Sequence, residues 1–209
     1  MRYVVAALLA LSLVTPAVAQ SRSFDLTGNV VWLDVTGGGS FEDLSDPADI
    51  DVDADIGYGA SANIFFSDRI SLEVALSRVS PEARVRRRAV GGATGNIDIM
   101  PLTGVLQWHF APNGFIDPYV GAGAAYVLFD NFDANGVSNI DRIDFDDDVG
   151  LAINAGLGIK LGGRLALVVD GKYVPLEANA RAVNVTGSGT EGRVDVSPII
   201  LSAGLSLRF

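Results

Sequence analysis

The sequence predicts an all-β fold, an eight-stranded antiparallel transmembrane β-barrel with short periplasmic turns and long extracellular loops. Three observations support this prediction. The last nine residues, LSAGLSLRF, alternate apolar with small or polar side chains and end on the aromatic Phe209. Seven further segments show a similar alternation, which in a barrel strand turns one face to lipid and the other to the lumen. The N-terminus has the pattern of an export signal.

Residues 1–19 are predicted to form a secretory signal peptide, and residues 20–209 a single outer-membrane β-barrel. Arg2 supplies a positive charge, an apolar stretch follows, and Ala17-Val18-Ala19 provides the small residues of a cleavage site. The remaining chain has no apolar run of the roughly 18 residues that a spanning helix needs. Hydrophobic residues still make up 49% of the sequence. We therefore expect an integral protein of a Gram-negative outer membrane.

The strands are expected near residues 24–35, 50–66, 69–80, 95–110, 115–129, 147–161, 164–176 and 194–209. In the second and third segments the even-numbered residues are mostly apolar, as in Val52 to Ile64 and Ile70 to Leu76. In the sixth segment the odd-numbered residues from Val149 to Leu161 are all apolar, whereas most of those between them are glycine or polar. Each segment is long enough for the roughly 9–11 residues of a tilted membrane strand.

The connections between these segments alternate in length. Short turns are expected at 67–68, 111–114 and 162–163, and long polar loops near 36–49, 81–94, 130–146 and 177–193. In barrels of this class the short turns are periplasmic, so we expect both termini in the periplasm. Aromatic residues fall where the two membrane interfaces are expected. They are Phe24, Phe66, Trp108, Phe110 and Phe209 at the periplasmic side, and Trp32 and Tyr126 at the outer side.

Residues 100–129 resemble the fourth and fifth strands of the OmpW family of small outer-membrane barrels. The resemblance rests on a Pro-Leu entry, a Gln-aromatic-x-Phe strand end, a short turn and then Pro-Tyr-Val-Gly-Ala-Gly. Pro198 ahead of the Ser-Ala-Gly…Arg-Phe ending is also similar. The resemblance implies an eight-stranded barrel and the passage of small hydrophobic molecules across the outer membrane.

An eight-stranded barrel is about filled by its own side chains or holds one small ligand. On the periplasmic half of the strands, the inward positions are mostly small or polar. On the extracellular half several become apolar, which predicts an apolar vestibule that binds a hydrophobic ligand. The predicted lining is Val31, Leu33, Val35, Ile97, Ile99, Val127, Phe129, Val174 and Leu176. The alternative is that these strands extend beyond the membrane and pack against the loops.

Charged residues form two further candidate groups. Inward parity places polar side chains in a lumen network, where buried charges must be paired or hydrated. The predicted members are Glu73, Asn154, Lys160, Asp170, Lys172 and Arg208. At the outer rim, Asp49, Asp51, Asp53 and Asp55 recur at every second position, so we expect them on one face, opposite Arg84, Arg86 and Arg88. The arginines point outward, toward lipopolysaccharide phosphates, unless a bulge at Pro81 turns them toward the aspartates.

We therefore predict a porin-like barrel that binds or passes small hydrophobic molecules, with no cofactor, no metal and no enzymatic activity. His109 is the single histidine and cysteine is absent, so the usual catalytic and transition-metal sites lack support. A net charge of −10 argues against nucleic acid. The expected partners are outer-membrane lipids, lipopolysaccharide and the barrel-assembly machinery, which would read the strand that ends in Phe209. The alternative is a structural or adhesive surface barrel of the OmpX or OmpA-domain type with a plugged polar lumen.

Overall fold

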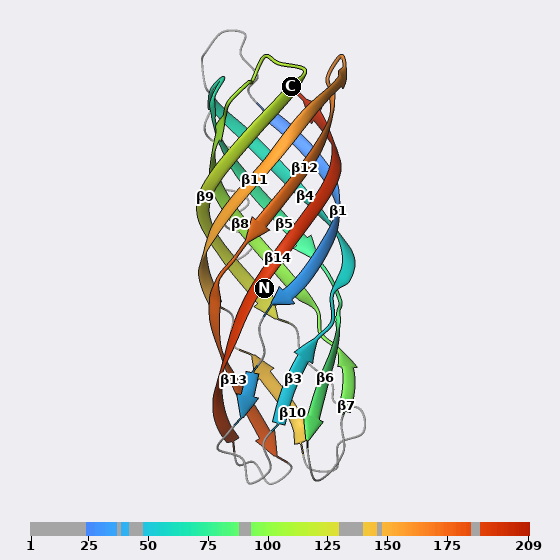
Figure 1. Ribbon diagram of the computed structural model, residues 1–209, viewed down its shortest axis with the longest axis vertical. Helices are drawn as coiled ribbons and strands as arrows, with labels where there is room; N and C mark the ends of the chain where they lie inside the picture. The colour runs from blue at the N-terminus through green and yellow to red at the C-terminus, as the bar shows by residue number, and fades with distance from the viewer. Residues whose placement is uncertain are drawn as a thin grey trace, which may run out of the picture.

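The computed structural model describes residues 24–36, 39–41, 48–87, 93–129, 140–145, 148–184 and 189–209. The predicted signal peptide lies outside these residues. Within them, eight long strands pair in antiparallel order, and the first pairs with the last to close a barrel (Figure 1). The predicted fold class is therefore confirmed. These strands are β1 (Phe24–Thr36), β4 (Asp55–Ser67), β5 (Ile70–Arg78), β8 (Ile99–His109), β9 (Ile116–Phe129), β11 (Asp148–Gly162), β12 (Leu165–Tyr173) and β14 (Gly189–Arg208).

One end of the barrel, called here the short-turn end, carries the tight connections between strands. Gly162 and Gly163 make one of them with φ of 127° and 55°, a backbone region that glycine adopts without steric cost. The first and last strands also meet here, since the Phe209 N–H donates to the Phe24 carbonyl (2.8 Å). The opposite end is called the loop end. No helix among the described residues is long and apolar enough to cross a membrane.

Additional strands extend the wall at the loop end, within the segments where the sequence predicted long polar loops. They are β2 (Gly39–Phe41), β3 (Ala48–Val52), β6 (Glu82–Arg87), β7 (Ala93–Asn96), β10 (Ile140–Phe145) and β13 (Leu176–Asn184). Each continues a hairpin of the barrel or pairs with its neighbour, for example β3 with β6 and β10 with β13. Pairing satisfies backbone groups that a loop would leave to water.

Three of the expected strands are interrupted, including the segment predicted at 95–110, because β7 ends at Asn96 and β8 begins at Ile99. The segment predicted at 50–66 is divided, because β3 ends at Val52 and β4 begins at Asp55. The segment predicted at 164–176 ends at Tyr173, and β13 begins at Leu176. Pro175 lies in the gap between β12 and β13 and has no N–H to donate to a ladder. Alternation in a sequence does not reveal such breaks when the residues on both sides continue to suit a strand.

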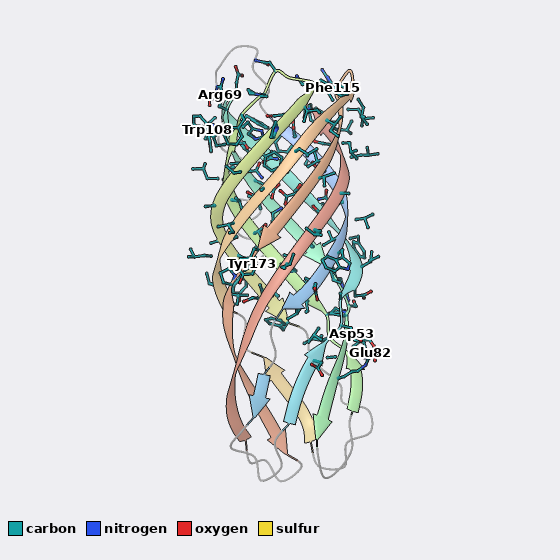
Figure 2. All side chains as sticks on the ribbon, viewed as in Figure 1. Asp53, Arg69, Glu82, Trp108, Phe115 and Tyr173 are labelled. Carbon is teal, nitrogen blue, oxygen red and sulfur yellow. The ribbon has the colours of Figure 1, made fainter. Side chains whose placement is uncertain are left out.

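The outer wall is apolar and bounded by aromatic rings. Leu26, Leu151 and Leu205 are exposed on it, as lipid contact requires. Figure 2 shows Trp108 and Phe115 near the short-turn end and Tyr173 further toward the loop end, with Asp53 and Glu82 beyond it. The rings thus delimit an apolar band that matches the hydrocarbon layer, and the strands of the loop end extend past it.

Candidate functional site in the barrel lumen

The loop-end half of the lumen is filled by one cluster of buried apolar side chains. Strand alternation turns every second residue inward, and the ring of strands brings these residues together from opposite walls. Leu33 from β1 and Val174, beside the end of β12, have no exposed surface. The cluster also includes Val31, Val79, Ala83, Ile97, Ile99, Val105, Ala125, Val127, Ala152, Leu176 and Ile200.

The residues predicted to line a vestibule all lie in or against this apolar cluster. Seven of them belong to it, namely Val31, Leu33, Ile97, Ile99, Val127, Val174 and Leu176. Val35 and Phe129 are partly buried and pack against it. Val79, Val105 and Ile200 were not predicted, although their inward parity was available in the sequence. The side chains of these residues are buried and packed together in one apolar cluster.

The short-turn half of the lumen is filled by a buried polar network. Lys172 from β12 lies between two carboxylates, with its Nζ 2.8 Å from Glu73 Oε1 and in contact with Asp170 Oδ1. Asp170 Oδ2 accepts hydrogen bonds from the Tyr119 hydroxyl (3.0 Å) and from Asn154 Nδ2 (2.9 Å). The two carboxylates share one ammonium group and neutral donors, as buried charges require.

Tyr119 was missed as a member of this polar network, although it lies within the Pro-Tyr-Val-Gly-Ala-Gly motif. Its ring lies over Gly156 of β11 to reach Asp170 on β12, since the three residues form one cross-strand row. A Cβ at position 156 would lie 2.5 Å from the Tyr119 hydroxyl oxygen, so Gly156 makes the space for this ring. The inward parity of Tyr119, two residues after Asp117 and two before Gly121, was the signal that could have placed it.

The polar network continues to the short-turn end through Gln107 and His109. Gln107 Nε2 donates to Glu73 Oε2 (3.2 Å), and the Ser71 hydroxyl lies 3.3 Å from Gln107 Oε1. His109 Nε2 is 3.0 Å from Ser71 Oγ, and its Nδ1 is 3.0 Å from Asp117 Oδ2. The sequence analysis did not predict these partners of His109.

Ser71, His109 and Asp117 are connected in the order of a serine-hydrolase triad. Ser71 has 0% exposed surface, and the His109 ring is covered by Phe65 and Tyr119, with centroid separations of 5.1 and 5.2 Å. A nucleophile must reach a substrate carbonyl, and this hydroxyl has no surface to present. The arrangement therefore stabilises the floor of the lumen.

The two remaining predicted members of the polar network lie near the short-turn end. Arg208 Nε is 3.6 Å from Asp25 Oδ2, which joins the last strand of the barrel to the first. Lys160 is half-buried and makes no side-chain ion pair with the other described residues. No group of three or more His, Cys, Asp or Glu among the described residues is arranged to hold a metal ion.

The outer-rim aspartates and arginines lie at the same level along the barrel axis. The four aspartates do not share one face of the wall. The strand register pairs Asp51 with Arg84 and Asp49 with Arg86, and Arg84 Nη2 lies 2.8 Å from Asp53 Oδ2. The interruption between β3 and β4 reverses the alternation, so the expectation of a single face is wrong for Asp55. Arg88 and the side chains of Asp49 and Arg86 lie outside the described residues.

The strand that carries Arg84 keeps its alternation through Pro81. Val79, Pro81 and Ala83 are buried on one face, whereas the side chain of Arg84 is 43% exposed on the other. Arg84 therefore points outward and also contacts a carboxylate, Glu82 Oε1 at 3.1 Å in addition to Asp53. Arg84 thus has the outward orientation, and it contacts Asp53 on that face without a bulge at Pro81.

Comparison with known proteins agrees with this architecture. The model of the OmpW family matches residues 28–209. The chain is 29% identical to the outer-membrane protein y4mB of Sinorhizobium fredii, over 80% of this chain and 69% of that protein. It is 29% identical to outer membrane protein AlkL of Ectopseudomonas oleovorans, over 83% of this chain and 73% of that protein. Outer membrane protein OprG of Pseudomonas aeruginosa has the same fold, with a TM-score of 0.77, 20% identity and coverage of 91% and 97% of the two chains.

Proposed function

Because the chain belongs to the OmpW family of outer-membrane barrels, we propose that it binds small hydrophobic molecules and passes them across the outer membrane. The observation that carries the proposal is the division of the lumen. Its loop-end half is lined by apolar side chains from every part of the wall, and its short-turn half is closed by a polar network. An apolar molecule finds a favourable environment in the first half and an unfavourable one in the second.

Binding in the apolar half requires side chains of the cluster to separate, since they are packed against one another. Replacing these contacts with contacts to a ligand costs little free energy, because the apolar surface remains buried in both cases. The polar network then blocks further movement along the axis. We propose lateral escape through the wall into the bilayer as the exit, which spares an apolar solute any transfer into water.

The test is transfer of an apolar fluorescent probe, N-phenyl-1-naphthylamine, into vesicles whose outer leaflet is lipopolysaccharide. Vesicles that contain the protein should take up the probe faster than protein-free vesicles. Leu33→Gln should slow uptake, because it places an amide in the apolar cluster, whereas the volume-conserving Leu33→Met should not. Uptake no faster than in protein-free vesicles would contradict the proposal.

The packed lumen also favours a second candidate, a structural or adhesive surface barrel that transports nothing. In that case the apolar cluster is a stabilising core, and the extended strands at the loop end present the functional surface. Uptake equal to that of protein-free vesicles, together with loss of surface adhesion when the loop-end strands are shortened, would support this candidate.

The proposal also covers the orientation of the barrel in the membrane and the processing of the N-terminus. The short-turn end would face the periplasm, residues 1–19 would be removed on export, and the barrel-assembly machinery would read the strand that ends in Phe209. Arg84 would contact lipopolysaccharide phosphates at the outer rim. We further propose that the protein is not an enzyme. A fluorophosphonate should leave Ser71 unlabelled, and labelling that Ser71→Ala abolishes would contradict this.

A further inference from the structure

A buried hydroxyl group lies inside the apolar half of the lumen. It belongs to Thr103 of β8, whose side chain is 3% exposed. Residues of β8 alternate between a buried and a more exposed side, and Thr103 shares the buried side with Pro101 and Val105. Its Oγ1 makes no hydrogen bond to any described residue. A buried polar group without a partner is unfavourable for folding, so its presence calls for a functional explanation.

The residues around Thr103 supply no side-chain partner. In the strand register Thr103 lies between Ala75 of β5 and Ala125 of β9. Its buried neighbours along β8 are Pro101 and Val105. None of these four side chains has a hydrogen-bond donor or acceptor. Val105 and Ala125 belong to the apolar cluster, so the hydroxyl lies within it. Because alanine ends at Cβ, the Thr103 hydroxyl extends further into the lumen than its cross-strand neighbours do.

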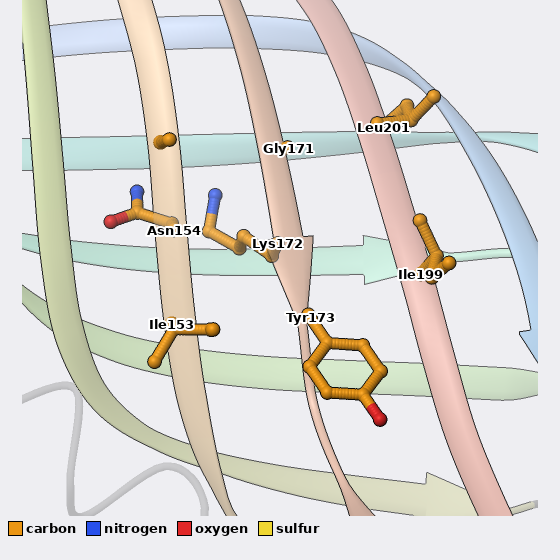
Figure 3. A pocket seen from close by; sticks show the side chains of 8 residues that line it. Ile153, Asn154, Gly171, Lys172, Tyr173, Ile199 and Leu201 are labelled. Carbon is orange, nitrogen blue, oxygen red and sulfur yellow. The ribbon is translucent and has the colours of Figure 1, made fainter.

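Another buried oxygen without a hydrogen bond, Asn154 Oδ1, has different surroundings. Asn154 is the cross-strand partner of Lys172 (Figure 3), and its Nδ2 donates to Asp170. A buried water molecule makes about three hydrogen bonds, and the polar network offers several groups for them. The four neighbours of Thr103 offer no such side-chain group. Water therefore suits the site at Asn154, whereas Thr103 suits a partner that is itself largely apolar.

We propose that Thr103 is a specificity-determining residue, whose hydroxyl donates a hydrogen bond to a neutral carbonyl oxygen of the bound molecule. The proposal rests on the proposed function and adds a residue that selects among apolar molecules. The apolar body of the ligand would replace contacts within the cluster, and its carbonyl would satisfy the Thr103 hydroxyl. The protein would thus bind an aliphatic ketone or ester in preference to a hydrocarbon of the same length.

Two other oxygen-bearing groups fit Thr103 less well than a carbonyl does. An alcohol that accepts the hydrogen bond from Thr103 keeps a hydroxyl hydrogen of its own, for which the four neighbours supply no side-chain acceptor. A carboxylate needs a paired cation when it is buried, and the described apolar cluster contains no basic side chain. A carbonyl has neither requirement, because it carries no donor and no charge.

The first experiment uses the full-length chain in vesicles whose outer leaflet is lipopolysaccharide. 2-Decanone and decane each compete with uptake of N-phenyl-1-naphthylamine, and the ratio of their inhibitory concentrations gives the preference for the ketone. Comparing this ratio between variants cancels the different partition of the two competitors into the bilayer. Thr103→Val should lower the preference about tenfold, which corresponds to ~1.4 kcal/mol. Inhibition by decane should stay unchanged.

Three further measurements control for folding and for the loss of any buried hydroxyl. Thr103→Val should be at least as stable as the unmodified protein in urea, because the hydroxyl has no hydrogen bond to lose. Thr103→Ser keeps the hydroxyl and should keep the ketone preference. Thr27→Val is the matched control, since Thr27 is a buried threonine of β1 in the short-turn half of the lumen. It should not change the preference.

Infrared spectroscopy reads the hydrogen bond directly and does not depend on transport. 2-Decanone labelled with ¹³C at the carbonyl has a stretching band apart from those of lipid esters, and hydrogen bonding lowers its frequency. Relative to protein-free vesicles, the unmodified chain and Thr103→Ser should show a lowered band, and Thr103→Val should lose it. A band that is the same in Thr103→Val and in the unmodified chain would overturn the proposal.

The outcomes separate the two proposals. If the unmodified chain takes up the probe and Thr103→Val keeps the full ketone preference, the role of Thr103 is overturned while the proposed function stands. If the unmodified chain takes up no probe, the proposed function fails, and the infrared band alone decides on Thr103. A lowered band that is lost in Thr103→Val would then still support a ketone-binding site, and the absence of such a band would overturn it.

Discussion

The two halves of the lumen are filled by the same eight strands but by opposite chemistry. At the loop end, apolar side chains such as Leu33 and Val127 lie in one buried cluster, held by contacts that have no fixed direction. At the short-turn end, Lys172 and its partners have defined donors and acceptors, so one arrangement is strongly favoured. We therefore expect the apolar half to change its packing more readily than the polar half, which forms the floor of the lumen.

Removing the cation of the polar floor should produce the largest effect. Lys172→Met leaves the buried carboxylates of Glu73 and Asp170 without their ammonium partner, which should lower the free energy of unfolding by about 3–5 kcal/mol. Urea unfolding followed by tryptophan fluorescence in detergent measures it. Adding Glu73→Gln and Asp170→Asn should restore most of the loss. A Lys172→Met variant as stable as the unmodified protein would show that the floor is not held by charge.

A cavity in the apolar half should lower the free energy of unfolding somewhat less than Lys172→Met does, and it should also increase ligand binding. Leu33→Ala should lower the free energy of unfolding by about 2–5 kcal/mol, because the surrounding side chains relax only partly into the space. An apolar dye should then bind the variant more tightly, measured by fluorescence titration. Leu205→Ala, on the lipid-facing wall, is the control. Unchanged dye affinity in Leu33→Ala would argue that the apolar half is only a structural core.

A single neutral hydrogen bond in the floor should contribute less to the free energy of unfolding than the charged pairs do. Tyr119→Phe removes one donor from Asp170, while Lys172 and Asn154 still contact that carboxylate. The expected loss is about 1 kcal/mol in the same urea experiment. Tyr58→Phe, on the exposed outer face, should be neutral and serves as the control. A loss as large as that of Lys172→Met would mean that Tyr119 positions the whole network.

The smallest effect is expected outside the membrane-spanning strands, at Asp98. The Ser80 hydroxyl and the Arg78 guanidinium hold the pKa of Asp98 below its usual range. The carboxylate form is the one stabilised, so its contribution is complete at neutral pH and is lost as pH falls through the lowered pKa. Because Arg78 is half-exposed, the contribution is at most ~1 kcal/mol.

Asp98→Asn measures this contribution. Its stability should lie slightly below that of the unmodified protein at pH 7, and the difference should vanish on acidification below the lowered pKa of Asp98. Equal stabilities at pH 7 would mean that Arg78 and Ser80 contribute nothing to folding through this residue.

Strand alternation in the sequence was sufficient to predict the barrel and the sides on which Leu33 and Glu73 lie. It did not predict the contacts within the lumen, because these join strands across the ring and depend on register. His109 and Asp117 lie on either side of a turn, and nothing local indicates that their side chains meet beside Ser71. The breaks at residues 53–54, 97–98 and 174–175 were missed for a related reason, since each is flanked by residues that suit a strand.

The pairing of β1 with β14 also determines how this chain must fold. Asp25 and Arg208 stand opposite each other in the register, so the seam joins residues from the two ends of the barrel sequence. Closing such a long loop carries an entropic cost that no local hairpin offsets, which makes ring closure a late and slow step. Until the seam forms, both terminal strands offer unpaired edges to other chains. The fully translated chain therefore needs protection from aggregation until it closes.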